Sequence, residues 1–295
     1  MTLEPLVTVF GSLHYDIAVN APARPRKGET VTGTSWYPKC GGKGGNQAVS
    51  AVRAGARTEM IGAVADDDFG HTLIANLAAK GVGHIHVRRD ANRSTGMSVA
   101  IFDAEGDYGA IIVSGSNLTL SDADVEAATA LLQKTAILVL QNEIPDAANV
   151  AAARVVQAAG GKVLLNAAPA RELSFELRGL IDVLVVNAIE AEMLAGTKAV
   201  ETLDDARAAA KRLAQFFPHV VVTAGGSGVA YGNSEGQTLV IDPIRVDVAS
   251  THGAGDEFIG VLAASLARFM DFRAALDLAN RAAAKLVGTP EDERT

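Results

Sequence analysis

Short apolar runs rich in Val, Ile and Leu alternate along the chain with longer Ala-rich stretches whose polar residues recur at helical spacing. This alternation is typical of a parallel sheet that is covered by helices on both faces. We predict strands at residues 7–10, 60–64, 137–140, 163–166, 183–187 and 220–223. The predicted helices are residues 46–54, 69–80, 122–134, 147–159, 203–216, 255–269 and 273–286. Gly81, Gly160 and Gly196 stand where C-terminal helix caps are expected.

Two segments break the alternation. Residues 18–38 contain Pro22, Pro25 and Pro38 among Val, Thr, Trp and Tyr, and residues 93–113 read as two strands, 98–102 and 110–113, around a turn at 104–107. We predict that both segments, about 15–38 and 93–113, join into a small β-sheet at the edge of a single α/β domain of residues 1–295. Such a sheet can act as a lid over a cleft. Two unrelated surface excursions remain the alternative, and the polar tail 290–295 is expected to fray.

Composition narrows the functional classes. The 295 residues are 48% hydrophobic and 20% charged, which excludes a disordered chain and allows one large domain or two smaller ones. A net charge of −8 without a long basic run argues against nucleic acid as a partner. The lone Cys40 excludes an intramolecular disulfide framework and suggests a reducing compartment. Since no apolar run is long enough to span a membrane, we expect a soluble cytoplasmic protein without membrane partners.

A glycine-rich loop at residues 41–45 opens the first predicted helix. Four glycines in five positions let the backbone approach a ligand, while Lys43 and Asn46 supply charged and amide donors. Gly44 follows Lys43 where a Walker A loop has Ser or Thr, and Gln47 stands where a dinucleotide fingerprint has its third glycine. The loop therefore belongs to neither motif, and a flexible turn before a helix is the alternative to a binding loop.

A second run of small residues, Gly253, Ala254 and Gly255, precedes Asp256 and the apolar stretch 258–269. Small residues at a helix start expose N–H groups to an anion, and the helix dipole favours negative charge there. Asp256 is either an ordinary first-turn acid, or a base held beside a phosphate that it helps to transfer. We expect the dipole to keep this carboxyl group ionised. One proton acceptor and a cradle of N–H groups suffice for phosphoryl transfer.

In their order and separation, these two motifs resemble the two signatures of the ribokinase-like (PfkB) carbohydrate kinase family. Matching pieces extend from Gly11 to about Val287: GSLHYD at 11–16, GETVTG at 28–33, Glu143, NAAPAREL at 166–173, Asn187 with Glu190, and TAGGSG at 223–228. The resemblance implies a three-layer α/β/α sandwich with a mostly parallel central sheet and a small β-sheet lid. It also implies a kinase that transfers the γ-phosphoryl group of ATP to the primary hydroxyl of a pentose, with ribose the first choice. Mg²⁺ and a homodimer formed through the lid are implied as well.

The resemblance further implies a role for each matching residue. Asp256 would take the proton from the sugar hydroxyl, while the helix start at Gly253, Ala254 and Gly255 would stabilise the transferred phosphoryl group. The sugar would be bound by His14, Asp16, Gly42, Lys43, Asn46 and Glu143. The nucleotide would be bound by Asn187, Thr223, Gly225, Ser227, Gly228, Gly255 and Asn280, and Glu190 would hold Mg²⁺ through water. For Asn187 and Glu190, helix capping is an alternative that the sequence leaves open.

The sequence differs from the family pattern at three places, and these differences lead to further predictions. His14 stands where ribokinase-like sequences have Asn, and Tyr15 replaces a small residue, so a kinase for another sugar or a nucleoside stays open. Ser250 replaces an Asp that helps to bind an activating monovalent cation, and the residues after Gly288 do not match the loop that completes that site. We therefore expect weak or absent activation by potassium.

Other readings have less support. A sugar- or nucleotide-binding protein without turnover is the alternative from another class, but Asp256 argues against it. A nicotinamide oxidoreductase lacks its fingerprint. His84 and His86 alternate as on a strand, without a third ligand for a metal. His252 is predicted to be a tolerated neighbour of the catalytic loop, and Cys40 a small buried side chain.

Overall fold

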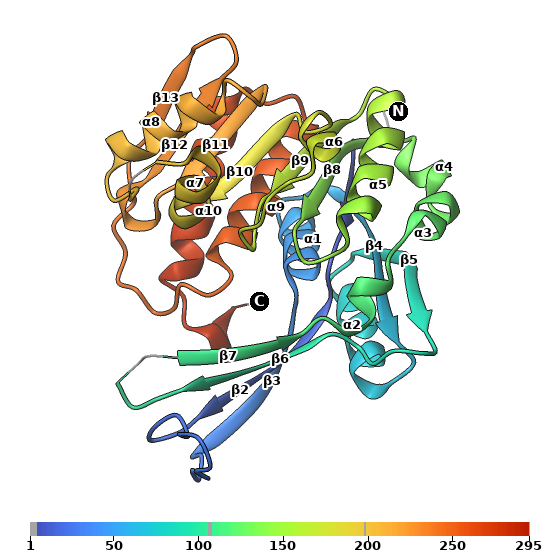
Figure 1. Ribbon diagram of the computed structural model, residues 1–295, viewed down its shortest axis with the longest axis vertical. Helices are drawn as coiled ribbons and strands as arrows, with labels where there is room; N and C mark the ends of the chain where they lie inside the picture. The colour runs from blue at the N-terminus through green and yellow to red at the C-terminus, as the bar shows by residue number, and fades with distance from the viewer. Residues whose placement is uncertain (1–4, 106–107, 198, 295) are drawn as a thin grey trace.

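A nine-stranded sheet forms the centre of the computed structural model, which describes residues 5–105, 108–197 and 199–294 (Figure 1). The strand order is β13-β12-β11-β10-β9-β8-β1-β4-β5, and within the described residues only β12 and β13 pair antiparallel with their neighbours. The strands are β1 (Leu6–Phe10), β4 (Arg57–Ala65), β5 (Gly83–Asp90), β8 (Thr135–Gln141), β9 (Lys162–Asn166), β10 (Val183–Asn187), β11 (His219–Thr223), β12 (Val229–Asn233) and β13 (Thr238–Ile241). This confirms the expected mostly parallel sheet.

Helices cover both faces of this sheet and bury a separate apolar core on each. Alternate residues of one strand point to opposite faces, so Val183 and Val185 of β10 join one core, and Leu184 and Val186 join the other. The first face carries α1 (Lys43–Arg53), α2 (Asp68–Ala79), α9 (Ala254–Ala267) and α10 (Phe272–Val287). The second carries α3 (Asp122–Ala127), α4 (Thr129–Leu132), α5 (Asp146–Ala158), α6 (Phe175–Arg178), α7 (Ala188–Ala195) and α8 (Leu203–Leu213). The three-layer sandwich predicted from the sequence is confirmed.

The chain order reverses between β1 and β8. From β1 the sheet grows outward through β4 and β5, and from β8 it grows in the other direction through β9, β10 and β11. The connecting loops diverge at such a reversal, which leaves a crevice beyond the carboxyl ends of the strands. The topology therefore predicts a ligand site beside Gly11, which follows β1, and Asn142, which follows β8.

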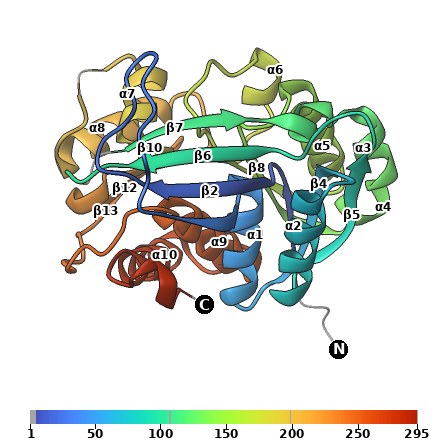
Figure 2. The same ribbon diagram turned by 90° about the horizontal axis from the view of Figure 1, so that it is seen from below.

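A second sheet of four strands projects from the main body in the order β3-β2-β6-β7 (Figures 1 and 2). Its strands are β2 (His14–Asn20), β3 (Ser35–Gly41), β6 (Met97–Phe102) and β7 (Tyr108–Val113). The two segments that broke the helical alternation thus join into one small sheet, as predicted. The predicted turn at 104–107 lies partly outside the described residues, because 106 and 107 are not among them.

Several sequence predictions are wrong in detail. The helix predicted at 122–134 is two short helices, α3 and α4, separated at Ala128. The pattern missed β5, β12, β13, α6 and α7. Of these, β5 carries charged side chains at the sheet edge, and α6 and α7 are short helices. Gly81, Gly160 and Gly196 do have positive φ angles of 76°, 86° and 58°.

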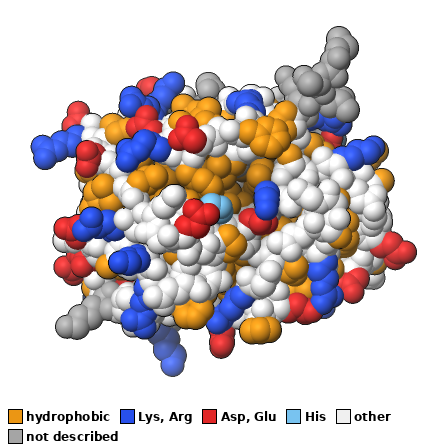
Figure 3. All heavy atoms as spheres, turned by 90° about the horizontal axis from the view of Figure 1, so that it is seen from above, with side chains coloured by type: hydrophobic (Ala, Val, Ile, Leu, Met, Phe, Trp, Pro, Cys, Tyr) orange, Lys and Arg blue, Asp and Glu red, His pale blue; other side chains and the backbone are white. Residues whose placement is uncertain are grey.

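Two features of the described structure concern membranes and charged partners. Within the described residues no helix combines the length and apolar character needed to cross a lipid bilayer. On the face opposite the small sheet, Lys and Arg side chains lie interspersed with Asp and Glu side chains rather than gathered together (Figure 3).

Candidate active site

Polar side chains meet in the crevice at the chain reversal. The Ser12 hydroxyl, two residues after β1, donates a hydrogen bond to Oε2 of Glu143, two residues after β8. The backbone N–H of Lys43 donates to the same oxygen at 3.0 Å, and Nδ1 of His14 lies 3.9 Å from it. His14 is 3% exposed, and its Nε2 has no hydrogen-bond partner among the described residues. The structure thus brings His14, Lys43 and Glu143 together.

The glycines of the 41–45 loop are required by the chain's own packing. Gly42, the N-cap of α1, has φ 84°, and a Cβ there would lie 2.7 Å from the backbone nitrogen of His14. A Cβ on Gly44 would lie 2.7 Å from the backbone nitrogen of Ser12, and one on Gly41 would lie 2.0 Å from the Asp16 carboxylate. The sequence pattern alone suggests a ligand as the reason for this close approach, but much of it serves to seat α1 against residues 11–16.

Asp16 lies on the small sheet and faces the main body. It accepts a 2.5 Å hydrogen bond from the Ser98 hydroxyl of the neighbouring strand β6. The adjacent Tyr15 instead stacks on Phe69 of α2, with ring centroids 4.1 Å apart. The bulky Tyr15 therefore contributes to packing between the small sheet and α2.

Asp256 lies in the first turn of α9 and is buried. Its two carboxylate oxygens accept 2.9 Å hydrogen bonds from the side-chain amides of Asn46 and Gln47 on α1. Gln141 at the end of β8 donates to Gln47 at 2.9 Å, which fixes the orientation of that amide. The two amides come from successive residues of one helix, so both carboxylate oxygens are held in a defined direction.

Burial governs the charge on Asp256. Loss of water raises the pKa of this carboxyl group above the ordinary 3.8, although Lys43 and the amides of Asn46 and Gln47 oppose the rise. The expectation that the helix dipole keeps the group ionised is therefore incomplete, because desolvation acts in the opposite direction and the pKa is raised. A carboxylate with a raised pKa is a stronger proton acceptor than an exposed one.

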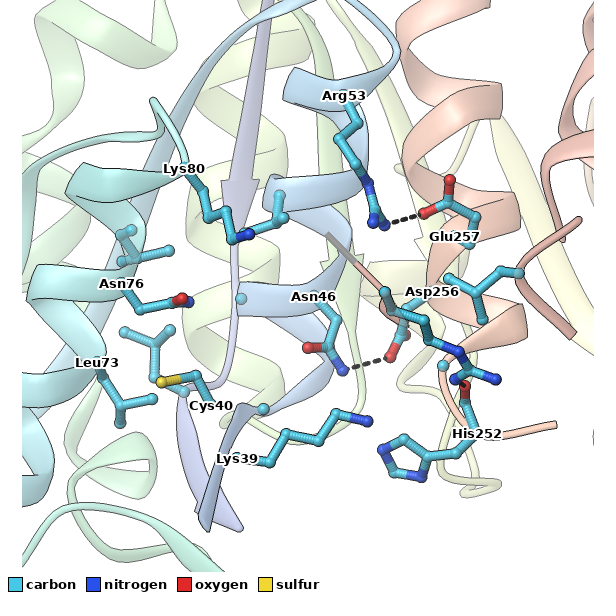
Figure 4. Close-up of a pocket in the computed structure, with 18 residues that line it drawn as sticks. Lys39, Cys40, Asn46, Arg53, Leu73, Asn76, Lys80, His252, Asp256 and Glu257 are labelled. Atoms are coloured by element: carbon cyan, nitrogen blue, oxygen red, sulfur yellow. Dashed lines mark hydrogen bonds and ion pairs between the residues drawn. The ribbon is translucent and has the colours of Figure 1, made fainter. Parts of the chain in front are cut away.

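Asp256 and Gly253 line two pockets on opposite sides of the start of α9. The first pocket also contains Asn46, His252, Lys39, Cys40 and Arg53, and Figure 4 shows Asp256 and His252 beside it. The second contains Lys43, Asn187, Glu190, Thr223 and Gly255. A side chain on Gly255 would meet no atom within 4 Å, so the backbone is open to a ligand there. Both pockets reach Asp256. Of the residues predicted to bind the sugar, Asn46 lines the first pocket and Lys43 lines the second, whereas His14, Asp16, Gly42 and Glu143 line neither.

Two further side chains line the first pocket. Cys40 is half-buried and lines the pocket, whereas the sequence predicts a small buried side chain. His252 also lines the pocket, and the residue is exposed. Both residues lie within reach of a ligand in this pocket.

Asn187 and Glu190 form a reciprocal helix cap in the second pocket. Asn187 Oδ1 accepts from the Glu190 N–H at 2.9 Å, and Glu190 Oε2 accepts from the Asn187 N–H at 2.8 Å. The capping alternative is thus observed, yet both residues also line the pocket. Burial raises the pKa of Glu190, while the Asn187 N–H and the charge of Lys43 lower it.

The remaining nucleotide candidates lie outside the lining of the second pocket. Gly225, Ser227 and Gly228 form the turn after β11, where Ser227 donates to the Glu201 carbonyl at 3.1 Å. Asn280 on α10 donates to the Asp242 carbonyl at 3.1 Å. Of the predicted nucleotide set, Asn187, Thr223 and Gly255 are brought together with Glu190 around one pocket.

Sequence reasoning missed the side chains that hold the acidic groups. Gln47 and Gln141 orient Asp256, Ser12 bonds Glu143, and Ser98 bonds Asp16. One signal was available, because Gln47 interrupts the apolar face of α1 and a buried amide needs a partner. Within the part of the chain that the structure describes, no group of three or more His, Cys, Asp or Glu side chains is arranged to hold a metal ion.

The arrangement suits transfer of an anionic group between two bound molecules. It offers a buried base at the junction of two pockets, the N–H groups of a helix start, and the cation of Lys43. First-turn N–H groups of a helix stabilise negative charge. The Ala254 N–H already makes a long 3.3 Å bond to the Thr251 carbonyl, which leaves Gly255 and Asp256 as the freer donors.

Comparison with known proteins agrees with this chemistry. The pattern described as "pfkB family carbohydrate kinase" matches residues 4–294. The ribokinase of Haemophilus influenzae is 32% identical over 96% of this chain and 92% of its own length, and the deoxyribokinase of Salmonella typhi is 33% identical over 92% and 88%. The structure of Arabidopsis thaliana ribokinase complexed with ribose and ATP superposes with a TM-score of 0.89 at 30% identity, covering 97% of this chain and 93% of that one. The chain belongs to the pfkB family of carbohydrate kinases.

Proposed function

We propose that this protein is an ATP-dependent kinase that phosphorylates the primary hydroxyl of ribose or a closely similar pentose. The observation that carries the proposal is the position of Asp256, which lies at the junction of two pockets and beside the N–H groups of a helix start. Relatives of this chain are named ribokinase and deoxyribokinase, which supports a pentose as the substrate. A cytoplasmic location remains a prediction, supported by the single Cys40.

The polar residues around the crevice are proposed to bind the sugar. Hydroxyl groups are recognised by carboxylates and amides in fixed orientation, because each hydroxyl both donates and accepts. Ser98 fixes Asp16, and Ser12 and the Lys43 N–H fix Glu143. The proposed sugar-binding residues are His14, Asp16, Gly42, Lys43, Asn46 and Glu143. His14, with its buried unpartnered Nε2, is the residue whose size and polarity would select among sugars.

The proposed reaction is a direct phosphoryl transfer. Asp256 accepts the proton of the sugar hydroxyl as its oxygen attacks the γ-phosphorus of ATP. The bond from that phosphorus to the β,γ-bridging oxygen breaks, and ADP leaves with the electron pair. Lys43 and the N–H groups of Gly255 and Asp256 would stabilise charge on the transferred group, which is the principal demand of this reaction.

We propose that Mg²⁺ accompanies ATP in the second pocket. Glu190 supplies one buried carboxylate there, next to Lys43 and Asn187. A single carboxylate fits Mg²⁺ that is held mainly by phosphate oxygens and water, because this ion retains its waters. When bound, Mg²⁺ would neutralise phosphate charge, and Glu190 would orient its water shell. Thr223 would line the nucleotide side, and Gly225, Ser227, Gly228 and Asn280 would contact the nucleotide further along the cleft.

An ADP-release assay across pentoses, deoxypentoses, hexoses and nucleosides tests the proposal. We expect ribose or a similar pentose to give the highest kcat/KM, with Asp256→Asn as the background. If a hexose or a nucleoside gives the highest kcat/KM, the pentose assignment is wrong, but the proposal that the protein is a kinase still holds. If no substrate exceeds the background, the chain is a sugar- or nucleotide-binding protein.

Asp16→Asn is expected to raise KM for the sugar about tenfold or more with a smaller change in kcat. The substitution removes a charged acceptor, and a hydrogen bond to a charged group is worth ~1.5–3 kcal/mol. Asp204→Asn is the matched control, because Asp204 lies on the exposed first turn of α8, where it pairs with Arg207 away from both pockets. An unchanged sugar KM in Asp16→Asn would remove Asp16 from the binding site.

We also propose that the small sheet is a lid within one domain and that two lids pair in a homodimer. The strand register places Trp36, Val19 and Ile101 in one row, and Ile17, Val99 and Ile111 in the next. Both rows lie on the face opposite Asp16 and Ser98, because alternate residues of a strand face opposite sides. Trp36 is 65% exposed and Ile111 is 73% exposed, so this apolar face is open to a partner.

Sedimentation velocity tests the dimer. We expect the wild-type protein to sediment as a dimer and Trp36→Asp to sediment as a monomer, because burying the new carboxylate in an apolar interface is costly. A wild-type monomer at micromolar concentration would refute the dimer. It would leave the kinase proposal untouched, because Asp256 and both pockets lie within one chain.

A further inference from the structure

The guanidinium group of Arg294 binds three backbone carbonyl oxygens at once. Nη1 donates to the carbonyl of His252 at 2.7 Å, Nη2 to that of Ser250 at 2.7 Å, and Nε to that of Thr289 at 2.9 Å. Arginine carries its positive charge at every accessible pH and presents its donors in a rigid plane. Three carbonyls therefore converge on one permanently charged group. The tail 290–295, expected from sequence to fray, is anchored here through Arg294, while residue 295 lies outside the described residues.

These carbonyls belong to the two segments that flank the proposed catalytic helix start. Ser250 and His252 lie in the loop that enters α9, and Thr289 follows the end of α10. The same segments are joined by the N–H groups of Ala249 and Ser250, which donate to the Val287 carbonyl at 2.9 and 3.2 Å. Arg294 thus completes a link between the end of α10 and the loop before α9.

The next residue along this loop is Gly253, which lines both pockets. Gly253 has φ 77°, and its carbonyl accepts the Glu257 N–H at 2.9 Å as the first turn of α9 forms. The peptide planes at 250–252 therefore determine the direction in which the N–H groups of Gly255 and Asp256 point. A displacement of about 1 Å in such groups is enough to cost ~10²-fold in rate.

Glu291 links the same loop to the lid through one hydrogen bond and one ion pair. Glu291 accepts from the Ser250 hydroxyl at 2.6 Å and pairs with Lys39 of β3 at 3.2 Å. Burial alone would raise the pKa of Glu291, but the Ser250 hydroxyl and the Lys39 charge hold it below the ordinary value. The tail thus supplies both a fixed cation and a fixed anion, and the segment after α10 lies between the small sheet and the main body (Figure 1).

We propose that Arg294 is a tethered cation that positions the loop before α9, and that it takes the place of a free monovalent cation at this point. The resemblance to ribokinase-like kinases implied a monovalent cation bound near residue 250, but the residues present do not fit one. Ser250 provides a hydroxyl that donates to Glu291, and the carbonyls of Ser250 and His252 already accept from the guanidinium. Arg294 is a positioning residue, and its effect on turnover rests on the proposed kinase function.

The test compares wild type with Arg294→Ala, Arg294→Lys and the control Arg207→Ala. Arg207 carries the same charge on the exposed surface of α8 and pairs only with Asp204 among the described residues. Two readouts are used: hydrogen exchange of the backbone amides at 252–256, and steady-state kcat with K⁺ titrated against choline at constant ionic strength.

We expect the 252–256 amides to exchange faster in Arg294→Ala than in wild type and Arg207→Ala. We also expect kcat to fall about tenfold or more in Arg294→Ala, and to recover saturably on addition of K⁺ or guanidinium. Wild-type kcat should not respond to K⁺, and Arg294→Lys should lie between wild type and Arg294→Ala, because an ammonium has fewer donors and no fixed plane.

Three results would overturn the inference: unchanged exchange in Arg294→Ala, a saturable K⁺ requirement of the wild-type enzyme, or a loss of kcat that neither K⁺ nor guanidinium restores although the variant unfolds at the wild-type temperature. If Arg294→Ala loses stability, the comparison of Arg294→Lys with Arg207→Ala decides the question. If the kinase proposal fails, the wild-type protein will release no ADP. The hydrogen-exchange comparison still tests whether Arg294 positions the loop before α9.

Discussion

Asp256→Asn is expected to lower kcat by about 10²-fold or more while the affinity for ATP stays close to that of wild type. The variant keeps the shape of the side chain but cannot accept the proton of the attacking hydroxyl, and general-base catalysis typically contributes 10²–10⁴-fold. The Asn46 amide can turn over, so that its oxygen accepts from the amide introduced at position 256. Steady-state ADP release gives kcat, and calorimetric titration with a non-hydrolysable ATP analogue gives the affinity. Wild-type turnover in this variant would exclude Asp256 as the base.

The same substitution should not weaken the fold near neutral pH. The pKa of Asp256 is raised in the folded protein above the ordinary 3.8. At a pH between 3.8 and the folded-state pKa, the folded protein therefore binds more protons than the unfolded chain. The contribution of Asp256 to stability is therefore present at low pH and is lost as pH rises through the folded-state pKa. Thermal unfolding should show Asp256→Asn gaining stability relative to wild type as pH is raised toward neutrality. A variant that instead loses stability over this range would show that the carboxylate is needed for folding.

Activity should increase with pH over the range in which this contribution to stability is lost. The base works only when ionised, so kcat/KM is expected to fall as pH is lowered through the folded-state pKa of Asp256. Under the proposed mechanism, catalysis and stability thus make opposing demands on this buried carboxyl group. The amides of Asn46 and Gln47 and the charge of Lys43 supply the stabilisation that keeps it usable as a base.

The fold was predictable where local pattern and tertiary packing agree. In a central strand such as Val183–Asn187, the four apolar residues are buried on both faces, so the apolar run locates the strand in the sequence. The edge strand Gly83–Asp90 has a solvent-facing side with charged residues, and its apolar run is interrupted. The small sheet was predictable as a non-helical pair of segments, but its order and register depend on pairing between residues far apart in the chain.

Some residues of the candidate site could be predicted from the sequence, and others could not. Asp256, Lys43 and Asn46 stand in short motifs, in which the proposed ligands would fix the residue types at fixed spacing. Arg294 stands in no motif, because its partners are backbone carbonyls that any residue can supply. The polar residues next to Arg294 in the sequence predicted a frayed end. The position of its guanidinium group is seen only in the folded structure.

The spacing between α1 and α9 depends on one glycine at their interface. Gly260 of α9 packs against α1, and a Cβ at Gly260 would lie 2.4 Å from the Ser50 Cβ and 2.7 Å from the Ala51 nitrogen. Ser50 also donates to the Glu257 carbonyl at 2.9 Å across the same interface. Gly260 therefore sets how closely the helix that carries Asn46 and Gln47 approaches the helix that carries Asp256.

Gly260→Ala is expected to destabilise the protein by about 1–3 kcal/mol and to lower kcat about tenfold or more. Alanine is favoured over glycine within a helix by ~1 kcal/mol, so a net loss would come from the forced separation of the helices. That separation would lengthen the 2.9 Å bonds from Asn46 and Gln47 to Asp256, and the base would lose its orientation. Denaturant unfolding and ADP release measure the two effects.

Gly179→Ala is the matched control for Gly260→Ala, because a Cβ there meets its nearest atom at an ordinary 3.6 Å and φ is −70°. The double variant Ser50→Gly with Gly260→Ala removes one of the colliding Cβ atoms, so it should be less destabilised than the sum of the two single variants. Partial recovery of kcat should accompany that coupling, because the Ala51 nitrogen still limits the approach. Strict additivity, or a Gly260→Ala protein as stable and active as Gly179→Ala, would show that α1 and α9 adapt to the added methyl group without moving the carboxylate.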